Sequence, residues 1–212
     1  MKTYNELKLA QELIRFPTVK TEDKGIMKFL SKKLSSIGFK CKIVKSKGNG
    51  PKPTLNLYAK FGNSRPHINF LGHTDVVANL NNWKIPPFRA IAKKGYLNGR
   101  GSQDMKGGIA CWISAVSNFV KKKKFKGSIS IIISADEETT GLGTPAVMKY
   151  LKRKGEKIDF SVVGEPSSNK LVGDEIRIGR RGSMNGKIIL YGKSGHSAFY
   201  GSYINPCTVL AK

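Results

Sequence analysis

The sequence predicts an α/β fold in which helices pack against a central mixed sheet. Two observations lead to this class. Short segments with the apolar pattern of strands alternate along the chain with amphipathic segments of helical spacing. The helical segments end at residues that stop helices, such as Pro17 after the first and Gly38 after the second. This alternation predicts a mostly parallel or mixed sheet.

The first half of the chain is expected to form two helices and then three strands. A capping-box pattern at residues 3–6 begins a helix that runs to about Arg15, and a second helix begins near Thr21. The expected strands cover residues 39–43, 55–61 and 68–71. The long segment 79–101 is expected to be an ordered loop, and loops of this length are usually functional or disordered.

The second half continues the alternation. The expected elements are a buried helix around residues 109–120, a central strand at 128–134, a helix from Thr144 to about Lys154 and a buried strand at 160–163. The pattern changes after Gly179, where an exposed strand at 184–191 and a helix at 206–212 are expected. We therefore predict a main domain over residues 1–180 and the beginning of another over residues 181–212.

The chain has a formal net charge of +24, from 38 Lys and Arg against 14 Asp and Glu. Such a charge is found in proteins that bind nucleic acid. The lysines are spread along the whole chain, however, and no nucleic-acid motif accompanies them. We favour a lysine-rich surface that attracts a small anionic substrate, with no nucleic-acid partner.

Composition also bears on the compartment. No apolar run is as long as a membrane span, and the first six residues lack the apolar core of a signal peptide. Cys41, Cys111 and Cys207 are odd in number and far apart, which is typical of reduced thiols rather than of a disulfide framework. The sequence therefore predicts a cytoplasmic protein without a membrane partner.

The few acidic residues gather where predicted strands end. His73 and Asp75 follow the strand at 68–71, and in an extended segment residues two apart point to the same face. This arrangement suits a metal-binding imidazole supported by a carboxylate. For this pair alone, an ordinary core histidine is the alternative.

Three further sites carry carboxylates. Asp104 lies in a glycine-dense turn before a helix, where the alternative is a capping residue. Residues 136–138 are three adjacent acids after a strand, which repel one another unless a cation lies among them; a solvated acidic loop is the alternative. Glu165 is the weakest indication by itself. Together the four sites predict a two-metal hydrolase, in which oxygen and nitrogen ligands suit zinc.

These motifs resemble those of the dinuclear zinc amidohydrolases and exopeptidases of the aminoacylase / carboxypeptidase G2-like family. The matching segments are residues 71–77, 99–108, 136–138, 143–144 and 164–166. They occur in order over almost the whole chain. The resemblance implies a zinc-exopeptidase-like sandwich as the catalytic domain, followed at residues 181–212 by the beginning of a small α+β dimerisation, or lid, domain.

The resemblance also implies a role for each matched residue. Four residues would hold two zinc ions, or cobalt in their place: His73, Asp104, Glu138 and Glu165. Asp104 would bridge both ions next to a cis peptide bond, Glu165 would share the first ion with His73, and Glu138 would bind the second. Asp75 would orient His73, and Glu137 would act as the general base and acid.

Two residues outside these motifs are implied to contact the substrate. Arg180 would hold a carboxylate with its planar guanidinium. His196 would reach the active site of a partner subunit and stabilise the oxyanion; an ordinary surface histidine is the alternative. The Gly-Arg-Arg-Gly-Ser element at 179–183 is most similar to the branch that hydrolyses N-succinyl-LL-diaminopimelate in lysine and diaminopimelate biosynthesis.

Other functions stay open as alternatives. Within the same class these are another N-acyl amino acid deacylase, similar to acetylornithine deacetylase, and a metallocarboxypeptidase. From a different class, a basic binding module could keep the fold without catalysis.

The chain departs from the family pattern in two respects. The family's last zinc ligand is a histidine in a C-terminal lobe, and none of His67, His73 and His196 corresponds to it. The family's usual Ala-Tyr-Pro-His is replaced by residues 198–201. We therefore expect an N-terminal fragment of a longer enzyme, which forms a homodimer at full length and is nearly inactive as this fragment.

Overall fold

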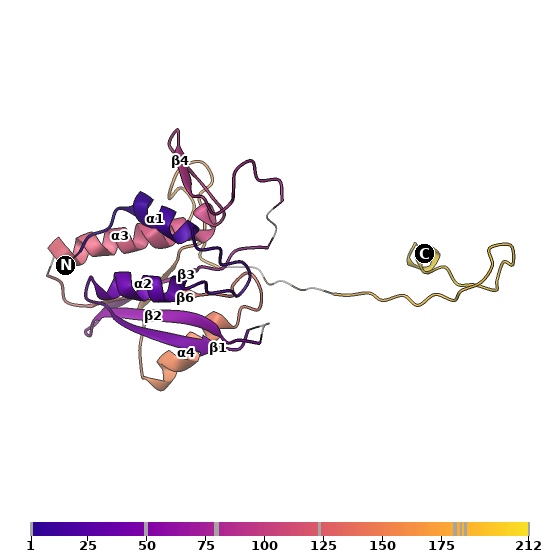
Figure 1. Ribbon diagram of the computed structural model, residues 1–212. Coiled ribbons are helices and arrows are strands. Elements are labelled where there is room, and N and C mark those ends of the chain that lie inside the picture. Colours follow the sequence, from indigo (N-terminus) through magenta and orange to yellow (C-terminus); the bar gives the residue numbers. More distant parts are fainter. Residues whose placement is uncertain are drawn as a thin grey trace. The chain divides into compact units, whose positions relative to one another are not determined.

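The computed structural model divides the chain into two compact units, Met1–Ser167 and Ser168–Lys212 (Figure 1). It describes residues 2–48, 51–78, 81–122, 124–179, 182, 184 and 186–211. The predicted boundary between two domains at residue 180 stays a prediction, and the two units are described separately below.

The first unit is built on a five-stranded sheet with the order β1-β2-β6-β3-β7. The strands are β1 (Lys40–Ser46), β2 (Thr54–Gly62), β3 (His67–His73), β6 (Ser128–Ser134) and β7 (Phe160–Val163). The pairs β1·β2 and β2·β6 are antiparallel, whereas β3 pairs in parallel with both β6 and β7. The predicted mixed sheet is therefore confirmed.

Helices cover both faces of this sheet. The helices are α1 (Glu6–Ile14), α2 (Ile26–Ser35), α3 (Gly107–Lys122) and α4 (Gly143–Arg153). Because side chains alternate along a strand, Ile131 of β6 packs with α1, α2 and α3, and Ile132 packs with Val147 and Leu151 of α4. Figure 1 shows α1, α2 and α3 on one side of the sheet and α4 on the other.

Two helices begin later than the sequence suggests. The side chain of Asn5, rather than that of Thr3, caps α1 by accepting a hydrogen bond from the Lys8 backbone. The second helix begins at Ile26 instead of near Thr21, because the Asp23 carboxylate accepts hydrogen bonds from the Gly25 and Met27 amides. Polar side chains near the helix start thus decide where each helix begins.

Strand β7 is exposed, which corrects the prediction that residues 160–163 are buried. Phe160 is 65% exposed, Val162 47% and Val163 53%. The reason is that β7 lies at the edge of the sheet and pairs only with β3. The expected loop at 79–101 also contains a short hairpin, formed by β4 (Ile91–Lys93) and β5 (Tyr96–Asn98).

The second unit has little regular structure among its described residues. It contains the short helix α5 (Pro206–Leu210), capped by the Asn205 side chain, and an antiparallel bridge between Lys193 and Ile204. The prediction of an exposed strand at 184–191 is wrong for the described residues 184 and 186–191, which form no strand; the bridge lies beyond them, at Lys193. Across the described residues of both units, no helix is long and apolar enough to cross a membrane.

Candidate metal centre

Three of the four proposed ligands lie at or after the carboxyl ends of parallel strands, and the fourth, Asp104, lies in a turn before α3. His73 ends β3 and lies opposite Ser134, which ends β6. The acidic residues 136–138 follow β6. Glu165 lies two positions after Val163, the last residue of β7. Parallel strands bring their carboxyl ends to one edge of a sheet, where binding sites form.

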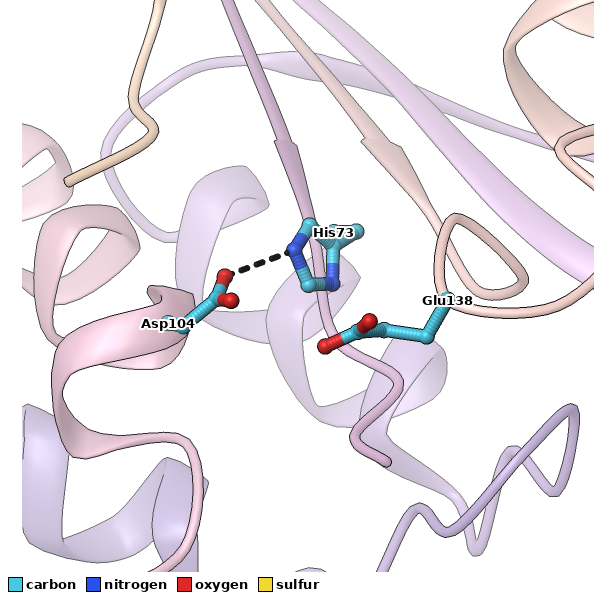
Figure 2. A group of neighbouring side chains, drawn as sticks. All are labelled: His73, Asp104 and Glu138. Carbon is cyan, nitrogen blue, oxygen red and sulfur yellow. Dashed lines mark hydrogen bonds and ion pairs between the residues drawn. The ribbon is translucent and has the colours of Figure 1, made fainter. Parts of the chain in front are cut away.

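His73 is the centre of this group. Its imidazole is buried, and Nε2 lies 3.0 Å from Asp104 Oδ1, 3.6 Å from Glu165 Oε1 and 4.0 Å from Glu137 Oε2. In Figure 2 the carboxylates of Asp104 and Glu138 approach the imidazole from separate segments of the chain. The interpretation of His73 as an ordinary core histidine does not fit so many carboxylates.

Asp104 lies in an irregular turn just before α3. Within residues Ser102–Lys106 the backbone of Asp104 and Met105 is not helical, and the peptide bond between these two residues is cis, as the resemblance implies. Asp104 is not the cap of α3, which begins at Gly107. Its side chain is 49% exposed and so faces both His73 and solvent.

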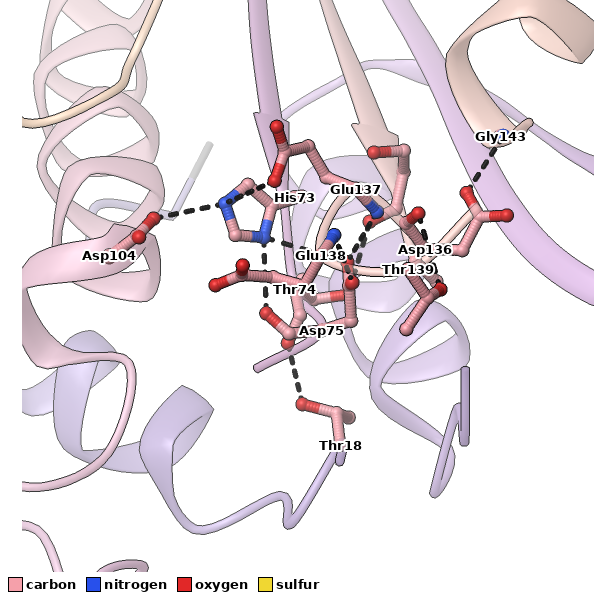
Figure 3. A network of polar contacts seen from close by, with 12 residues as sticks. Thr18, His73, Thr74, Asp75, Asp104, Asp136, Glu137, Glu138, Thr139 and Gly143 are labelled. Carbon is pink, nitrogen blue, oxygen red and sulfur yellow. Dashed lines mark hydrogen bonds and ion pairs between the residues drawn. The ribbon is translucent and has the colours of Figure 1, made fainter. Parts of the chain in front are cut away.

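Asp75 connects the histidine to the acidic loop. One carboxylate oxygen lies 3.5 Å from His73 Nδ1, and that nitrogen is also 3.1 Å from the Asp75 backbone oxygen. The same carboxylate accepts hydrogen bonds from the backbone amides of Glu137, at 3.2 Å, and Glu138, at 2.9 Å (Figure 3). This second contact has no indication in the local sequence.

The three adjacent acids at 136–138 do not converge. Asp136 is fully buried and accepts hydrogen bonds from the Gly143 amide, at 2.8 Å, and from the Thr140 hydroxyl. Figure 3 shows it directed toward α4, whereas Glu137 and Glu138 belong to the group around His73. Separate directions relieve the repulsion that three neighbouring carboxylates would otherwise have.

The electrostatics of the site reflect its crowding. Burial lowers the pKa of His73, but Asp75, Glu165 and Asp104 outweigh it and raise that pKa to about 9. Burial, together with the charges of Asp104 and Glu137, raises the pKa of Glu138. Anionic groups in such proximity favour a bound cation.

Two sets of donor atoms could hold a metal ion. His73, Asp104 and Glu138 form one set, and His73, Glu137 and Glu165 form the other, with the ligand atoms of each set within 4.8 Å of one another. Imidazole nitrogen and carboxylate oxygen are ligands that zinc takes, so the residues fit the ion. The role of each residue stays a prediction.

A pocket of about 330 Å³ opens beside these carboxylates. Asp104 and Glu138 line it together with Trp83 and Arg100, and the Arg100 guanidinium lies 5.1 Å above the Trp83 ring. The segment 79–101, which is expected from the sequence to be an ordered loop, therefore contributes residues to the pocket. Its size suits a small molecule.

Lys106 is a polar residue that sequence reasoning missed. It is fully buried, two residues after Asp104, and its Nζ donates a 2.8 Å hydrogen bond to the Phe16 carbonyl. Burial lowers the pKa of Lys106 to about 7, against an opposing effect of Asp75. No local pattern indicates that this lysine is buried, because lysines are so common in the chain.

The two predicted substrate residues lie apart from this group in the sequence. His196 is exposed in the second unit, where its Nδ1 accepts a hydrogen bond from the Ala198 amide. Arg180 lies outside the described residues. The substrate roles of both residues stay predictions.

The fold and this group of residues define a class of protein, and comparison with known proteins agrees. Residues 70–208 match the family described as peptidase family M20/M25/M40, so the chain belongs to that family. An M20 family metallo-carboxypeptidase from Sulfolobus solfataricus shares the fold, with a TM-score of 0.65 over 76% of this chain and 37% of that one at 19% identity. The sandwich fold and the family predicted from the motifs are therefore confirmed.

Curated relatives are more similar in sequence. Succinyl-diaminopimelate desuccinylase of Pelagibacter ubique is 51% identical over all of this chain and 56% of the relative. The protein of the same name from Ehrlichia chaffeensis is 46% identical over 90% of this chain and 51% of its own length. The chain thus spans about half the length of the curated relatives it matches.

Proposed function

We propose that the whole protein is a metal-dependent amide hydrolase that removes succinate from N-succinyl-LL-diaminopimelate. The observation that carries the proposal is the gathering of His73, Asp104, Glu137, Glu138 and Glu165 at one edge of the sheet. The name shared by the relatives that match the chain supports the choice of substrate. The activity belongs to lysine and diaminopimelate biosynthesis.

Two zinc ions are the proposed cofactors, and cobalt is expected to replace them. We assign His73, Asp104, Glu138 and Glu165 as the residues that would hold the ions, and Asp104 would serve both of them. When bound, zinc polarises a carbonyl oxygen and lowers the pKa of water. The irregular turn keeps Asp104 3.0 Å from His73 Nε2, which supports their joint role.

Glu137 is the proposed general base and acid. Its side chain is 43% exposed and lies 4.0 Å from His73 Nε2, so a water molecule beside the ligands is within its reach. It takes a proton from the attacking water and delivers it to the amine nitrogen as the amide C–N bond breaks. Asp75 supports this step by holding the Glu137 and Glu138 amides and by facing His73.

We assign recognition of the substrate's carboxylates to the positively charged residues of the protein. The net charge of +24 attracts a molecule with several carboxylates. Arg180 would pair with one of these carboxylates, and His196 would stabilise the oxyanion from a partner subunit of a cytoplasmic homodimer. Among the described residues of the first unit, His73 is the one histidine in the groups that could hold a metal ion, and we expect the polypeptide of 212 residues to be nearly inactive alone.

The direct test is an assay of the full-length protein with three substrates: N-succinyl-LL-diaminopimelate, N-acetylornithine and a dipeptide. The proposal predicts that the first is hydrolysed fastest. Turnover of acetylornithine alone would contradict the choice of substrate. Metal content near zero after dialysis would favour a binding protein without catalysis.

Two substitutions separate the proposed roles. Glu137→Gln should abolish turnover while the metal stays bound, because the amide keeps the shape but cannot carry a proton. Asp104→Ala should instead lower the metal content, because a shared ligand is removed. Equal and mild effects from both changes would show that the roles are assigned wrongly.

A further inference from the structure

Lys106 is a buried lysine in the same turn as Asp104, and the proposed chemistry does not use it. The residue is 0% exposed and is among the largest fully buried side chains in the described part of the chain. Lysine is almost never fully buried without a partner, because removing an ammonium group from water is costly. Its partner is the Phe16 carbonyl, to which Nζ donates at 2.8 Å.

The surroundings of Lys106 are fitted to its side chain. Gly101 has a φ of +82°, and a Cβ at that position would lie 3.2 Å from Lys106 Cδ. The Nζ atom lies 6.0 Å from the centre of the Phe88 ring. Glycine at position 101 therefore serves both the turn and the space that the lysine occupies.

Phe16 belongs to residues 16–20, which follow α1 and which we call the N-terminal strap. This strap also holds the segment that carries His73 and Asp75. The Thr18 hydroxyl donates to the Thr74 carbonyl at 2.5 Å, and the Val76 amide donates to the Thr18 carbonyl at 3.0 Å. The Lys20 amide donates back to the Val76 carbonyl at 3.2 Å. Figure 3 shows Thr18 beside Thr74 and Asp75.

The strap thus connects two segments that are distant in the sequence. Thr18 is hydrogen-bonded to Thr74, directly after His73. The Phe16 carbonyl accepts a hydrogen bond from Lys106, which belongs to the same turn as Asp104. The two side chains held in this way, His73 and Asp104, lie 3.0 Å apart. A change at either end of the strap should therefore alter their separation.

We propose that Lys106 is a positioning residue that fixes the Asp104 turn against the N-terminal strap and so sets the distance between Asp104 and His73. The proposal rests on the proposed function in one respect, namely that these two residues hold a metal ion. Lys106 belongs to neither group of possible metal ligands, and its Nζ is hydrogen-bonded to the Phe16 carbonyl.

The first test needs no metal. Hydrogen exchange of the metal-free protein is compared with that of Lys106→Met, which keeps the length of the side chain but cannot donate a hydrogen bond. The Lys20 and Val76 amides, which hold the strap, should exchange at least about tenfold faster, while the Leu30 amide in α2 should be unchanged. Unchanged exchange at Lys20 and Val76 would overturn the connection.

The second test measures cobalt binding by equilibrium dialysis and by the visible spectrum of the bound ion. Lys106→Met should weaken cobalt binding about tenfold and change the spectrum, because the turn that carries Asp104 would no longer be held to the Phe16 carbonyl. This is the lower end of the effect of losing a direct partner of a ligand, which is about 10-fold to 100-fold. Val120→Ala, a core change at the far end of α3, is the matched control and should leave the spectrum unaltered. A cobalt affinity and spectrum equal to wild type in Lys106→Met would overturn the positioning role.

Thr18→Val keeps the proposal testable if Lys106→Met does not fold. It replaces the hydroxyl group that bonds to Thr74 by a methyl group of similar size, and it should also weaken cobalt binding. Wild-type affinity in this folded variant would overturn the proposal. Failure of the wild-type protein itself to bind cobalt would contradict the proposed function, while faster exchange at Lys20 and Val76 would still support the connection.

Discussion

The carboxylate of Asp75 accepts a 2.9 Å hydrogen bond from the backbone amide of Glu138, although the two residues are 63 positions apart. The neighbouring amide of Glu137 donates to the same carboxylate at 3.2 Å. Asp75 therefore contacts both the backbone of the acidic loop and the imidazole of His73. One buried carboxylate thus contacts both the last residue of β3 and the loop that follows β6.

Replacement of Asp75 by Asn should weaken metal binding about 10-fold to 100-fold. The amide removes the negative charge that faces His73 and offers only one oxygen to the two backbone amides. Equilibrium dialysis with cobalt measures the effect. Asp159→Asn is a matched control. The Asp159 carboxylate also accepts a hydrogen bond from a backbone amide, that of His67, but at the opposite end of β3 from His73. Equal affinities for the Asp75 variant and this control would contradict the role of Asp75.

Replacement of Gly143 by Ala should destabilise the first unit by about 1–3 kcal/mol. A Cβ there would lie 2.4 Å from Asn56 Oδ1 and 2.7 Å from Asp136 Oδ1, both of which are held by buried hydrogen bonds. Urea unfolding measures the change in the free energy of unfolding. Gly179→Ala meets nothing within 4 Å and should have an effect within about 0.5 kcal/mol. If the Gly143 variant is as stable as that control, Asn56 and Asp136 can move away from the added Cβ without cost, which would contradict the prediction.

His67 should make stability depend on pH in the mildly acidic range. Burial, opposed by the hydrogen bond to the Lys157 carbonyl, lowers the pKa of His67 below its usual 6.5. The unfolded chain therefore binds a proton that the folded chain does not, so the free energy of unfolding falls as pH falls below about 6.5. Well above that pH, His67 is neutral in both the folded and the unfolded chain, and its contribution to the free energy of unfolding no longer changes with pH.

Urea unfolding at about pH 7, 6 and 5 measures this slope in the wild type and in His67→Asn. The variant should be less stable at every pH but should show a smaller loss between pH 7 and pH 5. Parallel curves for the two proteins would exclude His67 as the source of the pH dependence.

Much of the fold could be predicted from sequence because strands and helices leave local patterns. The alternation of Ile131 and Ile132 between two cores follows directly from the period of a strand. The exposure of Val162 could not be predicted, because an apolar strand at the edge of a sheet has the same pattern as a central one. The burial of β7 is decided by the elements that pack beside it and not by its own sequence.

The candidate site shows the same division. His73, Asp104 and the acids at 136–138 could be predicted as a group because each follows a strand or precedes a helix. The choice of Glu138 among those acids, and the inclusion of Glu165, rest on the family resemblance. The contacts of Asp75 with the acidic loop, and of Lys106 with the Phe16 carbonyl, join residues 62 and 90 positions apart. Such contacts depend on how the elements pack, and a single sequence carries no local pattern for them.

The central claim is that His73 and the surrounding carboxylates hold metal ions. Anomalous X-ray scattering from crystals of the zinc-loaded protein, recorded on either side of the zinc absorption edge, tests it most directly. The account predicts anomalous density within about 2.0–2.2 Å of His73 Nε2 and of a carboxylate oxygen of Asp104. Zinc density found only elsewhere on the protein, with none beside His73, would contradict it.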